Sequence, residues 1–145
     1  MRISTKVEYG LAALADIAIY SDNNSVVPAS DISERQGISQ KYLEQILVSL
    51  KHAGFIRAHK GSGGGYSLTR SAEKITMSEV LNALDNSILA DSIQSGSESS
   101  IRDQVNIRFW NRVDSNLREF AETVTLADFI AGCKSKENVW DMYVI

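Results

Sequence analysis

One short segment of the sequence carries hydroxyl, amide, ammonium and carboxylate groups side by side: Ser39, Gln40, Lys41, Tyr42 and Glu44. Such groups can bond with the edges of DNA bases, and a lysine can meet a phosphate. The same residues also suit a solvated helix surface. Any one of them, Glu44 for example, could therefore be exposed to solvent without contacting DNA. The residue types favour nucleic-acid recognition only if their surroundings hold them together on one exposed face.

A second candidate group is the glycine-rich stretch that begins with Lys60, Gly61, Ser62 and Gly63. Glycines reach the positive φ values of a tight connection and let backbone amides approach a phosphate. Lys60 is a candidate phosphate or minor-groove contact, and Arg2 is a further candidate DNA contact. The alternative is a nucleotide-binding phosphate loop. It is disfavoured because the trailing Gly-Lys-Ser/Thr is missing and no helix is expected directly afterwards.

The spacing of apolar residues predicts the helix that carries the first group. Leu43, Ile46, Leu47 and Leu50 recur at three- and four-residue steps, which places them on one face and the polar side chains largely on the other. Gly54 follows where a left-handed cap commonly ends a helix. The polar residues therefore lie on the outer face of an amphipathic helix.

A shorter helix is expected just before this one. Pro28 is typical of a helix start and Gly37 of a helix end, and Ser39 is a typical N-cap for the next helix. Two helices joined by a tight glycine-containing turn form a helix-turn-helix unit. Three further helix starts are predicted by capping-box spacing, at Thr5 with Glu8, Thr76 with Glu79, and Thr125 with Asp128.

The predicted fold is mainly α with a small β-hairpin wing, because the segments flanking the glycine-rich tip read as two short strands. This is a winged helix-turn-helix domain plus a long dimerisation helix. We assign residues 1–87 to the winged helix-turn-helix DNA-binding domain and residues 88–100, which are rich in serine, to a loop. Residues 101–145 are assigned to the dimerisation helix, a short helix and a C-terminal tail.

The long helix carries an apolar stripe that includes Val105, Phe109, Val113 and Leu117. An apolar stripe of this length, on a helix outside the compact domain, must be buried by packing against another surface. A second copy of the chain is the economical cover, since two-fold symmetry lets the same face bury itself. Packing against the chain's own domain is the alternative.

Composition and charge narrow the class of protein. The 145-residue chain has a net charge of −3, but residues 1–70 carry eight Lys or Arg against six Asp or Glu, whereas residues 71–145 carry seven against twelve. Positive charge is thus weighted toward the proposed DNA-binding half. No apolar run is long enough for a membrane span, and no secretory signal is recognised. Cys133 is the only cysteine, which is compatible with a reducing cytoplasm.

Catalytic and metal-binding patterns are missing. No Ser/His/Asp arrangement or carboxylate pair suggests an active site, so we predict that the chain is not an enzyme. His52 and His59 are separated by the turn into the hairpin, and no Asp or Glu lies near them in the sequence to act as a further metal ligand. This pattern favours surface or DNA-facing roles over metal binding. We predict no metal site and no cofactor.

Nearly the whole chain resembles the winged-helix regulators typified by IscR, NsrR and CymR, the Rrf family. The matching motifs are "ISTKVEYGLAAL", "ISQKYLEQILVSLKHAGFI", "KGSGGGYSL", "ITMSEVLNALD" and "FWNRVDSNLREFAETVTLADFI". The resemblance implies a homodimeric transcription regulator on a pseudo-palindromic operator, with the third helix in the major groove and the wing in the minor groove. Ser39, Lys41, Tyr42 and Glu44 match the family's reading-helix contacts. Lys60 stands where the family usually has an arginine, a better reader of a narrow minor groove.

Members of this family that bind an iron–sulfur cluster hold it with three cysteines in the loop before the long helix. Residues 88–100 contain neither cysteine nor histidine here. Thiolates are the ligands that such clusters need, so no cluster is expected. The chain is therefore most similar to CymR-like members, which repress genes of cysteine metabolism.

The C-terminal residues Tyr143, Val144 and Ile145 resemble the tail by which serine acetyltransferase occupies the active site of cysteine synthase (O-acetylserine sulfhydrylase). This resemblance implies cysteine synthase as a co-repressor bound through the tail. An equal alternative is a tail that packs on the dimer through Trp140 and Tyr143. The alternative function is a redox- or small-molecule-sensing regulator of the same family, acting through Cys133 or a pocket between the wing domain and the long helix.

Overall fold

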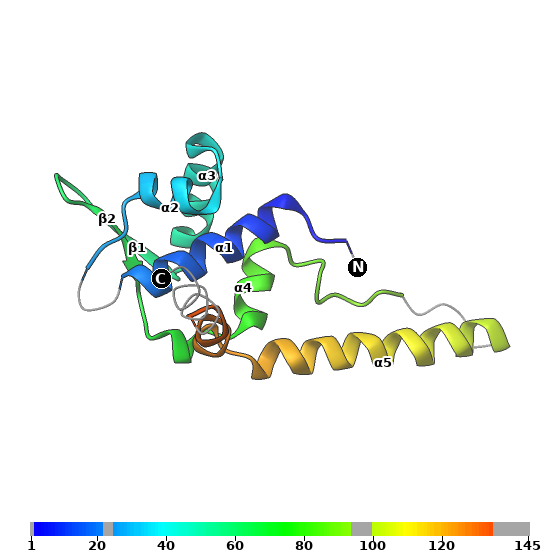
Figure 1. Cartoon of the computed structure of the whole chain (residues 1–145). Helices are drawn as coiled ribbons and strands as arrows, with labels where there is room; N and C mark the ends of the chain where they lie inside the picture. Colours follow the sequence, from blue (N-terminus) through cyan, green and yellow to red (C-terminus); the bar gives the residue numbers. More distant parts are fainter. Residues whose placement is uncertain (1, 22–24, 94–99, 135–145) are drawn as a thin grey trace, which may run out of the picture.

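The computed structural model describes residues 2–21, 25–93 and 100–134. A helical body carries a small hairpin that projects from it, and one long helix extends away from the body (Figure 1). The elements in chain order are α1 (Thr5–Tyr20), α2 (Ala29–Gln36), α3 (Gln40–His52), β1 (Ile56–His59), β2 (Gly65–Leu68), the short 3₁₀ turn η1 (Ala72–Lys74), α4 (Met77–Leu84) and α5 (Ile101–Thr123). A further helical segment spans residues 126–134. The mainly α fold with a β-hairpin wing is confirmed.

The core of the body lies where α1 and α3 cross. Leu14, Ile17, Leu43, Leu47 and Leu50 have almost no exposed surface. The predicted apolar face of α3 is therefore the face that packs inward, while its polar face is left outside. Burial of these branched aliphatic side chains is the main stabilisation of the body.

The helix-turn-helix unit has the predicted boundaries. Gly37 ends α2 with φ of 65°, and Ser39 caps α3 by accepting a hydrogen bond from the backbone N–H of Tyr42 at 3.3 Å. Gly54 follows α3 with φ of 86°, as expected of a left-handed helix end. These boundaries were predictable because glycine suits the left-handed conformation at a helix end and serine suits the N-cap position.

Two of the three predicted capping boxes are present. Thr76 and Glu79 exchange side-chain and backbone hydrogen bonds at the start of α4, and Thr125 and Asp128 do so at the start of segment 126–134. The prediction for Thr5 was one residue late, since the N-cap of α1 is Ser4, whose hydroxyl accepts from the backbone of Val7. Adjacent Ser and Thr are both good N-caps, so sequence alone did not separate them.

The wing is a two-stranded antiparallel sheet in which Ile56 pairs with Leu68 and His59 with Gly65. A backbone bridge from Val27 to Tyr66 ties the other edge of β2 to the segment between α1 and α2. Gly65 is needed there, because a Cβ at this position would lie 2.5 Å from the carbonyl oxygen of Val27. The wing is thus held to the body along one strand while its tip stands free.

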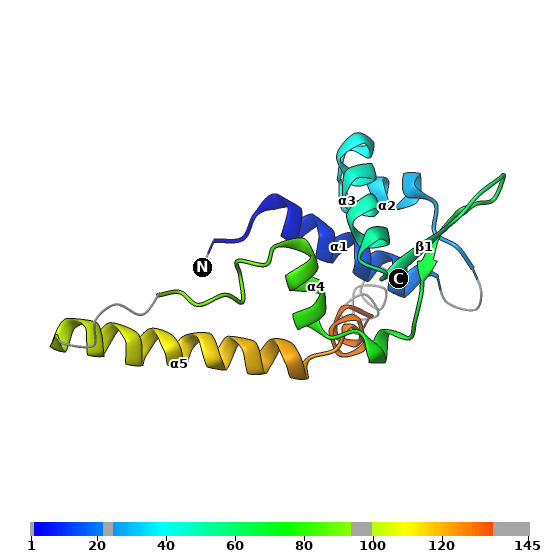
Figure 2. The same cartoon turned by 180° about the vertical axis from the view of Figure 1, so that it is seen from behind.

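The long helix α5 joins the body at its C-terminal end. The backbone N–H of Leu126 donates to the carbonyl of Ile75 at 2.8 Å, just after α5 ends. Ser92 and Asp114 are hydrogen-bonded, as are Arg118 and the carbonyl of Leu89, so the start of the predicted loop lies against the helix. In the views from the front and from behind, most of the length of α5 extends beyond the body (Figures 1 and 2).

Within the described residues, no helix has both the length and the apolar character needed to cross a membrane.

Candidate nucleic-acid interface

The outer face of α3 is the best candidate surface for DNA. Ser39, Gln40, Lys41 and Glu44 are exposed there, so the structure brings together four of the five residues singled out from the sequence. Their backbone is rigid, because the opposite face of the same helix is the centre of the core. A rigid helix with a polar outer face has the shape and chemistry that fit a major groove.

Tyr42 differs from its neighbours because it is half-buried. Its ring packs edge-on against Tyr9 of α1, with 5.9 Å between the ring centroids. The ring therefore helps to join α1 to α3. Tyr42 thus takes part in packing the body, and its exposed part stays a candidate contact to DNA.

Val48 was missed by the sequence reasoning. It lies one turn beyond Glu44 on the outer face of α3 and is 67% exposed, which is unusual for a large aliphatic side chain on a helix that anchors a core. An exposed aliphatic group can contact the methyl group of thymine. The signal was available in the sequence, since the four-residue step from Glu44 to Val48 keeps to the same face.

A hollow of about 520 Å³ lies where the start of α1 meets the start of α3, lined by Thr5, Tyr9, Gly37, Ser39 and Tyr42. The N-terminal ends of both helices reach this hollow. Helix N-termini favour negative charge, so a DNA backbone phosphate suits this position. Arg2, which precedes α1, is exposed.

At the wing tip, Lys60, Gly61, Ser62 and Gly63 are all exposed. Gly61 and Gly63 have positive φ, of 101° and 78°, so the tip depends on glycine at these positions. In both ribbon views the tip and α3 lie in the upper part of the molecule, while α5 runs along the lower part (Figures 1 and 2). The two sets of candidate DNA contacts therefore belong to one end of the body.

A partly buried ion pair, between the buried Asp16 and the more exposed Arg35, holds the helix-turn-helix against α1. Asp16 is only 2% exposed and receives two hydrogen bonds from Arg35, at 2.8 and 2.9 Å, and one from Gln36 at 2.8 Å. The guanidinium of Arg35 also lies 3.9 Å from the ring centre of Tyr20. The hydrogen bond to Asp16 raises the pKa of Arg35. These contacts fix the end of α2, and with it the turn that leads into α3.

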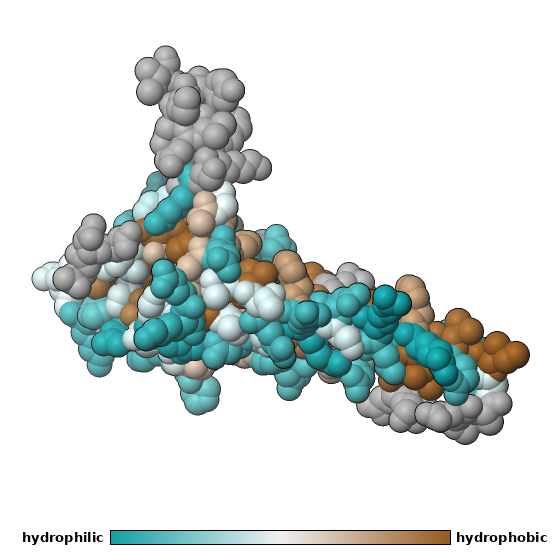
Figure 3. All heavy atoms as spheres, turned by 90° about the horizontal axis from the view of Figure 1, so that it is seen from below, coloured by the Kyte–Doolittle hydropathy of each residue, from teal (hydrophilic) through white to brown (hydrophobic). Residues whose placement is uncertain are grey.

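Along α5 the predicted stripe is mostly uncovered within one chain. Val105 and Phe109 are 58% and 59% exposed, Val113 is 39% exposed, and Leu117 is half-buried. Ile101, Trp110 and Phe120 add further exposed apolar surface. Apolar atoms gather at the outer end of this helix in the view from below (Figure 3). Val105, Phe109 and Val113 therefore do not pack against the chain's own domain, whereas Leu117 is partly covered by it.

Comparison with known proteins decides the family. The family model described as Rrf2, iron-dependent transcriptional regulator, matches residues 3–132. The chain belongs to the Rrf2 family of transcriptional regulators. It is 34% identical over 135 residues to the HTH-type transcriptional regulator IscR of Cereibacter sphaeroides, a match that covers 90% of this chain and 87% of the relative.

Solved structures of the same family have the same fold. CymR of B. subtilis, described as its global cysteine regulator, superposes with a TM-score of 0.77 at 25% identity, covering 90% of this chain and 97% of CymR. IscR of T. potens gives a TM-score of 0.73 at 29% identity, covering 92% and 88%. The oxidised form of CymR from Staphylococcus aureus gives 0.72 at 28%, covering 90% and 96%.

The family description names iron, but the residues of this chain do not fit a cysteine-ligated cluster. Cys133 is the only cysteine in the sequence and is exposed. In the described ranges, no group of three or more His, Cys, Asp or Glu side chains is arranged to hold a metal ion. We therefore assign no role in this protein to a cluster held by three cysteines.

Proposed function

We propose that this transcriptional regulator binds its operator as a homodimer, with α3 in the major groove and the wing in the adjacent minor groove. The observation that carries the proposal is the contrast between the two faces of α3. One face is buried in the core, and the other exposes Lys41, Glu44 and Val48 at helical spacing. Lys60, at the start of the wing tip, supplies the second contact.

The dimer follows from the uncovered stripe on α5. Val105, Phe109 and Val113 leave too much apolar surface exposed for a helix that projects from a soluble domain. Two copies that pair through this face would bury it and place two reading helices on one side of the assembly. Such a dimer matches a pseudo-palindromic site.

The test begins with selection of bound fragments from genomic DNA, which yields the operator. Lys41→Ala and Glu44→Ala should then each weaken operator binding by about 1–3 kcal/mol, measured by fluorescence anisotropy at fixed salt. Lys74→Ala is the matched control, since Lys74 is exposed on η1, outside the proposed interface. If all three variants bind the operator as tightly as the wild type, the proposal that α3 contacts DNA is wrong.

We further propose that the regulated genes belong to cysteine metabolism and that the protein acts as a repressor. Two observations support this: the likeness to CymR, and the absence of cysteine from residues 88–100. The genes beside the selected operators test it directly. Operators beside genes unrelated to sulfur would contradict it.

Cysteine synthase is the proposed co-repressor, bound through Tyr143, Val144 and Ile145. These residues lie outside the described ranges, so the proposal depends on their resemblance to the serine acetyltransferase tail. A peptide covering residues 138–145 should bind cysteine synthase, and O-acetylserine should displace it. The same peptide with an amidated end is the control. Binding that is indifferent to O-acetylserine would exclude this mode.

The second candidate is a sensing regulator of the same family. Cys133 is exposed and so accessible to oxidants, which keeps this candidate open. Cys133→Ser should then abolish any effect of peroxide on operator affinity. An unchanged peroxide response would leave Cys133 without a sensing role.

A further inference from the structure

Val48 has an exposed side chain that neither core packing nor helix formation explains. It is 67% exposed, and among the described residues 2–21 and 25–93 no other large hydrophobic side chain is as exposed; Ile3 and Tyr20 follow at 47% and 38%. Valine is also a weaker helix former than alanine, lysine or glutamine, because its branched Cβ restricts χ1. Another surface that contacts Val48 would account for an apolar residue at this position.

The position of Val48 on α3 is the centre of the outer face. At about 100° of rotation per residue, it lies roughly opposite Leu43 and Leu50, which are buried in the core. The side chains around it on the outer face are polar and exposed: Lys41, Glu44, Gln45, Lys51 and His52. Val48 is therefore a single apolar group within a polar surface.

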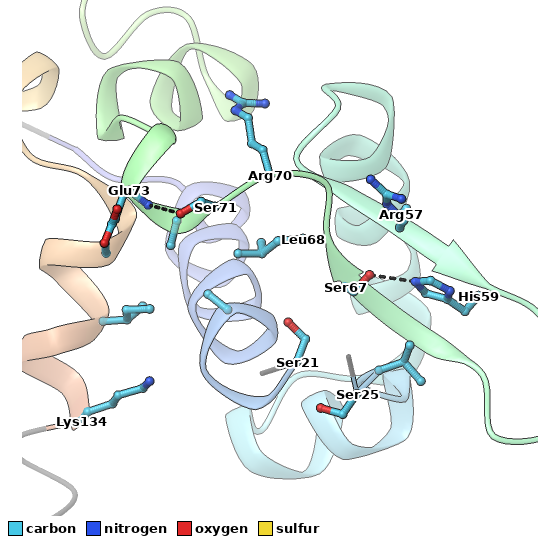
Figure 4. Close-up of a pocket in the computed structure, with 15 residues that line it drawn as sticks. Ser21, Ser25, Arg57, His59, Ser67, Leu68, Arg70, Ser71, Glu73 and Lys134 are labelled. Carbon is cyan, nitrogen blue, oxygen red and sulfur yellow. Dashed lines mark hydrogen bonds between the residues drawn. The ribbon is translucent and has the colours of Figure 1, made fainter. Parts of the chain in front are cut away.

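The other candidate binding surfaces of the protein do not cover Val48. The apolar stripe of α5 lies in the lower part of both ribbon views, whereas α3 lies in the upper part (Figures 1 and 2). A pocket of about 640 Å³ lies between the C-terminal end of α1, the wing strands and segment 126–134, and its described lining includes no residue of α3 (Figure 4). Contacts confined to α5, or a small molecule in this pocket, would leave Val48 exposed.

The major groove of DNA offers a feature that matches this surface. Among the groups that base edges present there, the C5-methyl group of thymine is the apolar one, and hydrogen-bond donors and acceptors surround it. A valine on a helix keeps its methyl groups nearly fixed, since it strongly prefers one χ1 rotamer. Little side-chain entropy is then lost when DNA covers it. The exposed ammonium groups of Lys41 and Lys51 suit the phosphates that border the groove.

We propose that Val48 determines part of the operator sequence by packing on the C5-methyl group of one thymine in each half-site. This inference rests on the proposed placement of α3 in the major groove and adds one base that the helix reads there. A cytosine, adenine or guanine at the same position has no methyl group. Its polar edge would lose water against Val48 without gaining a hydrogen bond, which disfavours these bases.

The test uses the selected operator, in which each thymine of the half-site is replaced in turn by deoxyuridine, which lacks only the C5-methyl group. Binding is measured by fluorescence anisotropy at fixed salt. Loss of one buried methyl group should weaken wild-type binding by about fourfold at one position, and by about tenfold or more when both half-sites are changed. Val48→Ala should bind the thymine operator about tenfold or more weakly and should not respond to this replacement.

Two controls separate methyl recognition from other effects of the substitution. Lys41→Ala, on the same face of α3, should weaken binding to both operators and keep the ratio between their affinities. Circular dichroism and sedimentation of Val48→Ala should match the wild type. A changed oligomeric state would show that a second copy of the chain covers Val48, and the proposal would be wrong.

The outcomes distinguish this inference from the proposed function. If no thymine responds to the replacement, or if Val48→Ala keeps the response, Val48 does not recognise a methyl group. The placement of α3 on DNA would still hold in that case, provided that Lys41→Ala and Glu44→Ala weaken operator binding. If these two substitutions have no effect, or if no operator is selected, α3 does not contact DNA and both proposals fail.

Discussion

The body of this protein and its long helix are built on opposite principles. In α3, apolar residues such as Leu47 are almost fully buried, and the exposed face is mainly polar. In α5 the large apolar side chains, Phe109 among them, are exposed, whereas a charged residue, Asp114, is buried. The body thus completes its core within one chain, and α5 does not. If α5 pairs two copies as proposed, stability and assembly depend on separate regions of the chain, and substitutions can alter each of them separately.

The largest expected effect is on assembly. Phe109→Glu should place an unpaired charge in the proposed α5 interface, at a cost of about 3–5 kcal/mol for each copy. Sedimentation should then show a monomer with a folded body. Asn111→Glu, at an exposed polar position on the same helix, is the control and should stay dimeric. A stable dimer of the Phe109 variant would place the interface elsewhere.

The second effect is on the body. Leu47→Ala should lower the free energy of unfolding by about 2–5 kcal/mol, because it leaves a cavity in the core. Val48→Ala is a matched control, since the neighbouring side chain is 67% exposed where Leu47 is 1% exposed. Chemical denaturation followed by circular dichroism measures both. Equal losses in the two variants would contradict the assigned inner and outer faces of α3.

A third change addresses how the body holds its reading helix. Asp16→Ala removes the carboxylate that accepts three hydrogen bonds from Arg35 and Gln36. The free energy of unfolding should fall by about 2 kcal/mol. Operator affinity should fall as well, because α2 loses its tie to α1. Asp31→Ala, at an exposed position in the first turn of α2, is the control. Loss of stability with full operator affinity would show that the ion pair does not position α3.

The smallest effect concerns the contact between Ser92 and Asp114, which joins α5 to the segment that follows α4. The hydrogen bonds from the hydroxyl and backbone N–H of Ser92 lower the pKa of Asp114 below its ordinary value. A carboxyl group with a lowered pKa in the folded state stabilises that state above its ordinary pKa of about 4, and this contribution is lost as pH falls through the lowered value. Asp114→Asn should therefore flatten the fall in thermal midpoint below that pH. Identical acid profiles would show that this contact does not stabilise the fold.

Much of the fold was predictable because its signals are local. Gly37 and Gly54 adopt the left-handed conformations expected of helix ends, and the hydroxyl of Ser39 caps α3. The wrong assignment of Thr5 as a cap shows the limit of such signals, since Ser4 is chemically equivalent and one residue earlier. Where two neighbouring residues serve equally well, packing further along the helix decides between them.

The candidate site was predicted less completely. Tyr42 has the residue type of a DNA contact, but Tyr9 lies against its ring, and nothing in the spacing of the sequence indicated that contact. Val48 was missed because an aliphatic residue on a helix is ordinarily assigned to the core. Its exposure is set by the packing of α3, whose other sides contact α1, α2, β1 and α4.

The amino-acid sequence by itself determined the order of the elements, the turn into α3, the glycine tip of the wing and the lack of thiolates for a cluster. Each of these depends on neighbours in the chain or on residue type alone. Tertiary structure decided the rest: which polar residues of α3 stay exposed, the ion pair between Asp16 and Arg35, and the pocket shared by α1, the wing and segment 126–134. These features join residues far apart in the chain, so they exist only after the apolar faces have packed.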